Sequence, residues 1–257
     1  MQTVNTRISA AADWSAAERQ VREDLAACYR LIAHFNWDDL IYTHISARVP
    51  GTEEHFLINP YGMTFDEVTA SSLIKVNSAG CKLDDSPWMV NEAGFVIHSA
   101  VHMGRPSSGC VIHLHSCDGV AVSAMDEGLM PLNQMAVAVG CNVAYHEYEG
   151  PAFRMEERDL LLASLGDKTT MILRNHGTLA VGASVAEAFL AMYMLERSCA
   201  IQVRSLAGGR ALHAIDQAAI DFTRKIAVSH ADATHAQRLV WPAMLRLLDR
   251  SGANFRD

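Results

Sequence analysis

Two histidines, His113 and His115, lie two residues apart in the short apolar segment Val111-Ile112-His113-Leu114-His115. The segment is typical of a strand, and residues i and i+2 of a strand point to the same face. Both imidazoles therefore project from one side, an arrangement that suits a divalent transition metal. The pattern fits equally well two histidines on a half-buried strand, each bound to a backbone group. A third ligand and an acid/base group elsewhere in the chain would decide between these interpretations.

His176 is the candidate for the third ligand. It follows an apolar, β-branched segment at residues 169–173 and precedes Gly177, where the backbone can turn sharply and aim a side chain. This context favours a ligand over a surface loop histidine, which is the common alternative. Asn175 can bind neighbouring loop groups through its amide, so we expect it to support the ligands.

Glu92 is the carboxylate candidate, in the segment Val90-Asn91-Glu92-Ala93-Gly94. It lies at the expected start of a helix, where the helix dipole favours a negative charge. A favourable first-turn glutamate is therefore the simpler interpretation, and an acid/base role requires a metal nearby.

Two further histidines, His98 and His102, lie four residues apart on one face of the same predicted helix. Such a pair can bind a metal, as in HExxH helices, but here no glutamate follows the first histidine. We therefore expect a structural or supporting role for them. His44 follows Thr43 on a predicted strand and is a candidate for the rim of the site.

Composition limits the class of protein. The 257 residues, half of them hydrophobic, are enough for one large domain, and the net charge of −8 argues against nucleic acid as a partner. No apolar run is long enough to span a membrane, and the polar N-terminus does not resemble a signal peptide. Six scattered cysteines are typical of reduced thiols, so we expect a cytoplasmic protein. Sequence motifs of the GxSxG, Walker A and GxGxxG types are absent.

Hydrophobic periodicity and capping residues predict a sheet covered by helices, in a single domain over residues 1–257. Residues 1–13 are expected to form a flexible arm and residues 207–257 to contain C-terminal helices. Strands are predicted at residues 42–49, 55–58, 74–76 with a return past Gly80, 109–115, 142–146 and 169–173. Helices are predicted at residues 15–34, 68–73, 91–103, 118–125, from Pro131, and at 156–165, 184–206, 214–229 and 234–249.

Four motifs follow one another along the chain: Ile58-Asn59-Pro60-Tyr61-Gly62, Asn91-Glu92-Ala93-Gly94-Phe95-Val96-Ile97-His98, Val111-Ile112-His113-Leu114-His115 and Leu173-Arg174-Asn175-His176-Gly177. The set is specific, because an HxH pair is flanked by an upstream glutamate and a downstream NHG. Together the motifs resemble the class II aldolase/adducin family, from about residue 20 to residue 205. Two further segments, residues 42–48 and 145–150, look closest to the adducin-like branch.

The resemblance implies a three-layer α/β/α fold around a largely antiparallel sheet. It also implies a cyclic homotetramer with active sites at subunit interfaces and one divalent ion per subunit, Zn²⁺ first, with Mn²⁺, Fe²⁺ or Co²⁺ as alternatives. By position, His113, His115 and His176 correspond to the metal ligands and Glu92 to the acid/base carboxylate.

The segments that hold phosphate in the sugar-phosphate members differ here. Small donors are replaced by Thr43-His44, Tyr61-Gly62 and Val90-Asn91, so we expect Thr43, His44, Tyr61, Gly62 and Asn91 to bind a small, non-phosphorylated substrate. For the tyrosine that some members use as an acid, Tyr148 is the candidate.

The resulting prediction is a metal-dependent carbon–carbon lyase acting on a small hydroxy-carbonyl or hydroxy-acid substrate. Retro-aldol cleavage and decarboxylation both pass through a metal-stabilised enolate, so the site residues do not separate them. Two alternatives remain at this stage: an adducin-like, non-enzymatic interaction module, and a non-haem iron oxygenase that uses Glu92 with the histidines.

Overall fold

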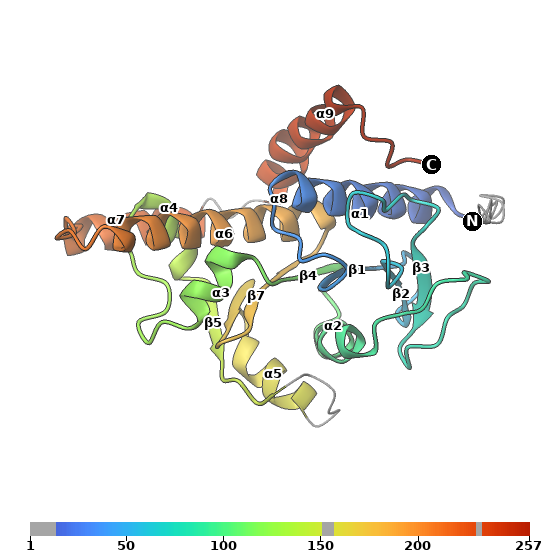
Figure 1. Ribbon diagram of the computed structural model, residues 1–257, viewed down its shortest axis with the longest axis horizontal. Helices are drawn as coiled ribbons and strands as arrows, with labels where there is room; N and C mark the ends of the chain where they lie inside the picture. Colours follow the sequence, from blue (N-terminus) through green and yellow to red (C-terminus); the bar gives the residue numbers. More distant parts are fainter. Residues whose placement is uncertain (1–13, 151–156, 230–232) are drawn as a thin grey trace.

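A single seven-stranded sheet forms the centre of the molecule (Figure 1). The computed structural model describes residues 14–150, 157–229 and 233–257. The strand order is β3-β2-β1-β4-β7-β6-β5, and all neighbouring strands are antiparallel except the parallel pair β5 and β6. The strands are β1 (His44–Arg48), β2 (His55–Ile58), β3 (Ile74–Asn77), β4 (Cys110–Leu114), β5 (Val143–His146), β6 (Thr170–Leu173) and β7 (Gly177–Gly182).

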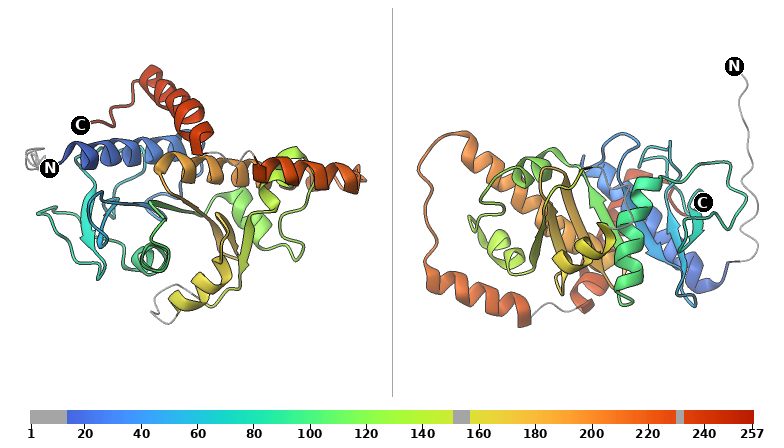
Figure 2. Two further views of the ribbon diagram at one scale, coloured as in Figure 1. Left: turned by 180° about the vertical axis from the view of Figure 1, so that it is seen from behind. Right: turned by 90° about the horizontal axis from the view of Figure 1, so that it is seen from below.

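Helices cover both faces of this sheet, which confirms the three-layer α/β/α fold (Figures 1 and 2). One face carries α1 (Ala16–His34) and α6 (Val185–Ala207), and the opposite face carries α2 (Glu92–Gly104) and α5 (Glu157–Leu165). The remaining helical elements are α3 (Cys117–Ser123), α4 (Gln134–Gly140), α7 (Gln217–Ser229), α8 (Ala233–His235), the π-helical turn η1 (Ala236–Val240) and α9 (Trp241–Ser251).

Strand β4 distributes its side chains between the two cores. Cys110, Ile112 and Leu114 belong to the large apolar cluster beneath α1 and α6, whereas Val111 belongs to the cluster on the α2–α5 face. Because side chains alternate along a strand, His113 shares the face of Val111. The fold therefore places this buried histidine between the sheet and the α2–α5 layer.

Strand β7 is the main element that the sequence interpretation missed. It lies at the centre of the sheet between β4 and β6, although its terminal glycines, Gly177 and Gly182, are typical of turns. Close packing explains both glycines. A Cβ atom added at Gly177 would lie 2.3 Å from the carbonyl oxygen of Leu114, and one added at Gly182 would lie 2.3 Å from the amide nitrogen of Ala188. The glycines thus allow β7 to approach neighbouring backbone.

The helix predicted at residues 68–73 is wrong, since this segment consists of turns. Thr69 and Ser72 account for the difference: each side-chain hydroxyl accepts a hydrogen bond from the other residue's backbone amide, at 3.3 and 2.9 Å. Such local bonds compete with helix formation.

Several boundaries also differ from the predicted ones. Helix α4 begins at Gln134 rather than Pro131, because Asn133 caps it by accepting a hydrogen bond from the amide of Ala136. Strand β1 begins at His44 rather than residue 42, because Thr43 adopts a left-handed backbone conformation with φ of 65°. The return past Gly80 is a single bridge to Val76. The arm predicted at residues 1–13 lies outside the described residues.

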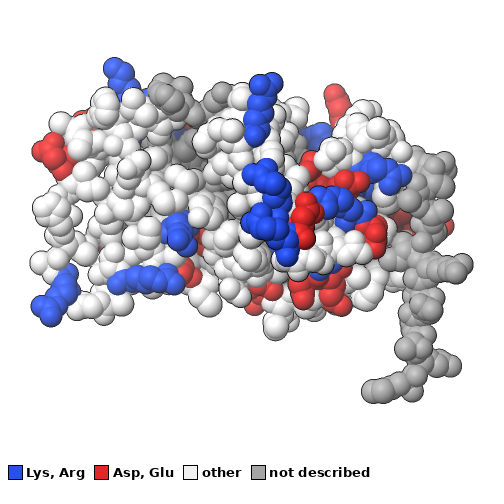
Figure 3. All heavy atoms as spheres, turned by 90° about the horizontal axis from the view of Figure 1, so that it is seen from above, with Lys and Arg blue, Asp and Glu red and all other residues white. Residues whose placement is uncertain are grey.

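Charged side chains of both signs are interspersed on the face viewed in Figure 3, and they gather toward the end of the molecule that carries the N-terminus. Over the described ranges, no helix combines the length and apolar character needed to cross a membrane.

Candidate metal centre

Three histidines converge at one end of the β4–β7 strand pair. His113 lies in β4, His115 follows the end of that strand, and His176 lies in the turn between β6 and β7. Antiparallel pairing of Leu114 with Thr178 brings this turn beside the end of β4. One ring nitrogen of each histidine lies within 4.8 Å of the others, and the ring centroids are 4.8 to 4.9 Å apart. We call these three residues the histidine triad.

The hydrogen bonds of the triad assign its tautomers. His113 Nδ1 lies 3.0 Å from the carbonyl oxygen of Thr178, and His115 Nδ1 lies 3.3 Å from the Asp39 carboxylate. Both partners are acceptors, so both Nδ1 atoms carry the proton and both Nε2 atoms present a lone pair. These two Nε2 atoms are 3.0 Å apart. Two lone pairs at this distance repel each other unless a cation is shared between them, so the triad fits a bound metal ion.

Burial keeps these imidazoles neutral. It lowers the pKa of His113 well below its ordinary value and also lowers that of His115, although the Asp39 carboxylate opposes the shift at His115. The pKa of His176 is lowered to about 4, mainly by burial and to a lesser extent by the neighbouring His115. Neutral imidazole is the form that binds metal, so the triad is ready to bind at neutral pH.

The turn that carries His176 depends on its backbone. Asn175 adopts a left-handed conformation with φ of 55°, which asparagine tolerates better than most residues, and its amide donates to the carbonyl of Ser123. Its side chain is exposed. Gly177 then passes so close to Leu114 that no larger residue fits there. Asn175 thus contributes its backbone geometry to the placement of His176.

His44 lies beside the triad, directly opposite His113 across the β1–β4 pairing, with ring centroids 5.6 Å apart. The preceding residue, Thr43, is buried, and its hydroxyl has no hydrogen-bond partner within the part of the chain that the structure describes. A buried hydroxyl without a partner is costly, and such a group is commonly satisfied by a ligand or water.

His98 and His102 form a buried row behind His44, and Ser46 lies between them. His102 Nδ1 lies 3.0 Å from the Ser108 carbonyl, so its Nε2 accepts from the Ser46 hydroxyl at 2.7 Å. The Ser46 oxygen then accepts from His98 Nδ1 at 2.6 Å. His98 Nε2 is left as an acceptor without a partner among the described residues, and the His98 ring lies 4.3 Å from that of His44. His98 therefore contacts His44, which lies opposite His113 across the β1–β4 pairing.

Four further predicted site residues, Tyr61, Gly62, Asn91 and Glu92, lie on two chain segments that are bridged to each other. Tyr61 donates its amide to the carbonyl of Met89 at 2.9 Å, which holds the Tyr61–Gly62 turn beside the segment that leads through Asn91 into α2. Gly62 has a φ of 110°, a conformation that favours glycine. Glu92 is the first residue of α2, and its side chain lies outside the described part of the structure.

Tyr148, the candidate acid, is 54% exposed, and its ring centroid lies 6.4 Å from that of His176. The two residues line one small pocket. Tyr148 therefore lies on the solvent side of the triad, close to His176.

Sequence reasoning missed two carboxylates near the triad. Asp39, the partner of His115, lies in the loop between α1 and β1, and no spacing singles it out. Glu196 is fully buried on α6 and accepts hydrogen bonds from the hydroxyls of Ser116 and Thr178. Burial raises the pKa of the Glu196 carboxyl to about 6. A signal for Glu196 was present in the sequence, since Met192, Leu195 and Cys199 surround it with apolar positions at helical spacing.

Known proteins with similar sequences cover nearly the whole chain. A Caulobacter vibrioides protein, provisionally named as an aldolase class 2 protein, is 52% identical over 245 residues, which is 95% of this chain and 94% of that protein. Mouse alpha-adducin is 49% identical over 193 residues, covering 74% of this chain but only 26% of the adducin.

Solved structures share the fold. An aldolase II superfamily protein from Pseudomonas syringae superposes with a TM-score of 0.89 at 46% identity, covering 95% of this chain and 98% of that one. L-fuculose 1-phosphate aldolase from Glaciozyma antarctica PI12 superposes with a TM-score of 0.82 at 27% identity, covering 97% and 98%. The family described as Class II Aldolase and Adducin N-terminal domain matches residues 23–203. The chain therefore belongs to the class II aldolase and adducin family, as its motifs predicted.

Proposed function

We propose that this protein is a divalent-metal-dependent carbon–carbon lyase with its reaction centre at the histidine triad. The observation that carries the proposal is the 3.0 Å approach of two Nε2 lone pairs, on His113 and His115, in a cluster that includes His176. Neutral imidazoles oriented by acceptors on their far nitrogens are the usual ligands of Zn²⁺, and Mn²⁺, Fe²⁺ and Co²⁺ are alternatives. When bound, such an ion supplies a Lewis acid that stabilises negative charge on a substrate oxygen.

The chain's own groups would handle the proton and the substrate. Glu92, at the start of α2, would act as the acid/base carboxylate, taking a proton from a substrate hydroxyl or returning one to carbon. The free, buried hydroxyl of Thr43 would donate to a substrate oxygen beside His44. Tyr148 would be the acid on the solvent side of His176.

The substrate is proposed to be a small hydroxy-carbonyl compound or hydroxy acid without a phosphate. The five residues assigned to bind it, Thr43, His44, Tyr61, Gly62 and Asn91, include no lysine or arginine. Phosphate sites usually combine backbone amides with such cations, so this set is better suited to a neutral or singly charged ligand.

An activity screen with the metal-loaded protein tests this proposal. The substrates would be hydroxy-aldehydes, β-hydroxy-α-keto acids and hydroxybenzoates, each with a phosphorylated counterpart where one exists. We expect turnover with a non-phosphorylated compound, its loss in His113→Ala, and its retention in His213→Ala, an exposed histidine in the segment between α6 and α7. Full activity of His113→Ala would contradict the assignment of the site, and turnover that requires iron and oxygen but not zinc would instead favour an oxygenase.

A non-enzymatic interaction module is the second candidate, and the 49% identity to mouse alpha-adducin supports it. The two candidates differ in metal content. Protein that binds no divalent ion, and gains none on incubation with Zn²⁺ or Co²⁺, would favour the interaction module.

We also propose that the protein assembles as a cytoplasmic homotetramer. Helix α7 packs mainly against α4, and its Phe222 and Ile226 side chains are 66% and 41% exposed, an apolar surface that a second copy could cover. Light scattering coupled to gel filtration would give four times the 28.1 kDa chain mass if this is correct, and the mass of one chain if it is wrong.

A further inference from the structure

Glu196 is a buried acid that lies beneath the histidine triad. It lies on α6 with none of its surface exposed. No lysine, arginine or histidine forms an ion pair with it within the described ranges. Burying an unpaired carboxylate is costly, and a fold retains such a group only where its partners compensate for that cost.

Its partners are two hydroxyls, each on a segment that carries triad residues. The Ser116 hydroxyl, next to His115, donates to Oε2, and the Thr178 hydroxyl donates to Oε1 at 2.5 Å. Thr178 lies two residues after His176, and its carbonyl oxygen accepts the hydrogen bond from His113 Nδ1. One carboxylate therefore links the end of β4 to the start of β7, and through Thr178 it also bears on the orientation of the His113 ring.

The Ser116 hydroxyl is used completely in this arrangement. It donates its single hydrogen to Glu196 and accepts a hydrogen bond from the Gly119 amide at 3.0 Å, which caps α3. A Cβ atom at Gly119 would lie 2.7 Å from the Ser116 oxygen and 2.9 Å from Glu196 Oε1. Only glycine lets the first turn of α3 close over this carboxylate, so the enclosure is a tight feature of the fold.

The two hydroxyls that donate to Glu196 supply dipoles but no positive charge, and among the described residues no cation pairs with it. A divalent ion at the triad would add a positive charge next to the segments that Glu196 holds, in a medium of low polarity where charges interact over longer distances than in water.

We infer that Glu196 is a positioning residue and a buried counter-charge that strengthens binding of a divalent ion by the histidine triad. This inference rests on the proposed metal centre. It assigns to Glu196 two separable effects: its hydrogen bonds hold the strand ends that aim the histidines, and its negative charge favours the ion.

Titration with Co²⁺ in competition with a chelator tests the inference, with the cobalt absorption band as the spectroscopic readout. We expect Glu196→Gln, which keeps the shape and removes the charge, to weaken Co²⁺ binding by about 10- to 100-fold, the range for partners that orient metal ligands. Thr178→Val, which removes the hydroxyl but keeps the carbonyl bonded to His113, should weaken binding by a smaller factor.

Gln202 provides the matched control. It is also buried on α6, accepts from the Met130 amide and donates to the Gly128 carbonyl, so it anchors a different loop. Gln202→Met should reduce thermal stability and leave Co²⁺ affinity unchanged. Metal-free Glu196→Gln should melt at or above the temperature of the metal-free wild type, because an uncompensated buried charge is gone.

The outcomes separate this inference from the proposed function. Wild-type protein that binds no Co²⁺ would contradict the metal centre itself, and the inference with it. Wild type and Glu196→Gln that bind Co²⁺ with equal affinity would overturn the inference alone. A Glu196→Gln variant that loses stability but not affinity would also overturn it, since its role would then be structural only.

Discussion

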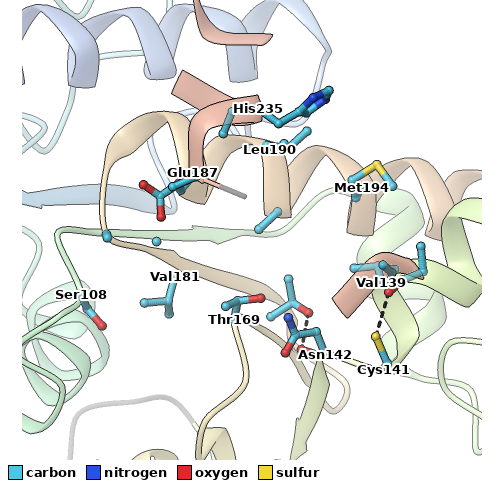
Figure 4. A pocket seen from close by; sticks show the side chains of 18 of the residues that line it. Ser108, Val139, Cys141, Asn142, Thr169, Val181, Glu187, Leu190, Met194 and His235 are labelled. Atoms are coloured by element: carbon cyan, nitrogen blue, oxygen red, sulfur yellow. Dashed lines mark hydrogen bonds between the residues drawn. The ribbon is translucent and has the colours of Figure 1, made fainter. Parts of the chain in front are cut away.

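The two ends of the β4–β7 strand pair differ in chemistry and in shape. At one end, the three histidines of the triad converge, and a small pocket borders His176. At the opposite end, near Gly182, a cavity of about 530 Å³ opens between the sheet, α4, α6 and the α7–α8 region (Figure 4). Most of its lining is apolar, with Val139, Val181 and Met194 among the residues in view.

This difference shows that the volume of a cavity and the concentration of reactive groups are separate properties. The large cavity has the size of a ligand site, yet the cluster of possible metal ligands found among the described residues lies at the triad and not on its lining. The triad end has converging nitrogens, perturbed pKa values and a buried carboxylate, the features by which active sites are recognised. The chemistry is therefore assigned to the triad end.

Paired substitutions at the two ends of β4–β7 test whether the chemistry belongs to the triad end. The largest effect is expected from His113→Ala, which removes a proposed ligand and leaves the Thr178 carbonyl without the hydrogen bond from His113 Nδ1. Steady-state activity of the metal-loaded protein should fall by more than the roughly 100-fold that loss of an outer hydrogen-bond partner causes. Met194→Leu in the cavity should leave activity unchanged, and a comparable loss in that variant would remove the distinction between the two ends.

Two glycine substitutions test how closely the backbone must approach at each end. In Gly177→Ala the new Cβ would lie 2.3 Å from the Leu114 carbonyl, so we expect a loss of about 1–3 kcal/mol in the free energy of unfolding and weaker metal binding. Gly140→Ala, at the end of α4 where nothing lies within 4 Å, should cost no stability. Urea denaturation measures both, and an unchanged midpoint for Gly177→Ala would show that the turn can relax.

Asp39→Asn tests the orientation of His115. The neutral amide would weaken the charge-assisted hydrogen bond to Nδ1 and reduce the basicity of the coordinating Nε2, so metal affinity should fall by about 10-fold. The neighbouring Asp38→Asn serves as the control and should bind metal with wild-type affinity. Equal affinities for all three proteins would mean that Asp39 does not orient the ligand.

The pH dependence of stability should be weak near neutral pH and should grow as the pH falls. Burial lowers the pKa of His102 to about 3, below the unfolded value of 6.5, so the unfolded chain binds the proton first as the pH falls. Stability is therefore complete above about pH 6.5 and declines toward pH 3, with a slope of at most about 1.4 kcal/mol per pH unit for this residue. Chemical denaturation at several pH values should show a shallower decline for His102→Gln and an unchanged one for His235→Gln, an exposed residue near the cavity. A steeper decline for His102→Gln would contradict the direction of the pKa shift of His102.

The local sequence was sufficient to predict a feature where one short-range rule governs it. The spacing of His113 and His115 required only the period of a strand. The helices predicted from residues 15 and 184 do begin there, because Ser15 and Ser184 cap α1 and α6. These features depend on neighbours a few residues away, which the sequence displays directly.

Features that depend on long-range packing were not accessible in this way. Gly177 and Gly182 are typical of turns, and only their contacts with distant backbone explain them as the ends of a central strand. Asp39 meets His115 across 76 positions, and Glu196 meets Ser116 across 80. No periodicity reports contacts at such separations, so the sequence led to the candidate ligands but not to the carboxylates that contact His115 and Ser116.

X-ray absorption at the metal edge of the Zn²⁺-loaded protein, combined with metal analysis per chain, shows whether the triad holds the ion. The account predicts one ion per chain, with three imidazole nitrogens at about 2.0–2.1 Å, and loss of that ion in His113→Ala. A chain that retains no ion, or an ion whose imidazole signal is unchanged in His113→Ala, would contradict it.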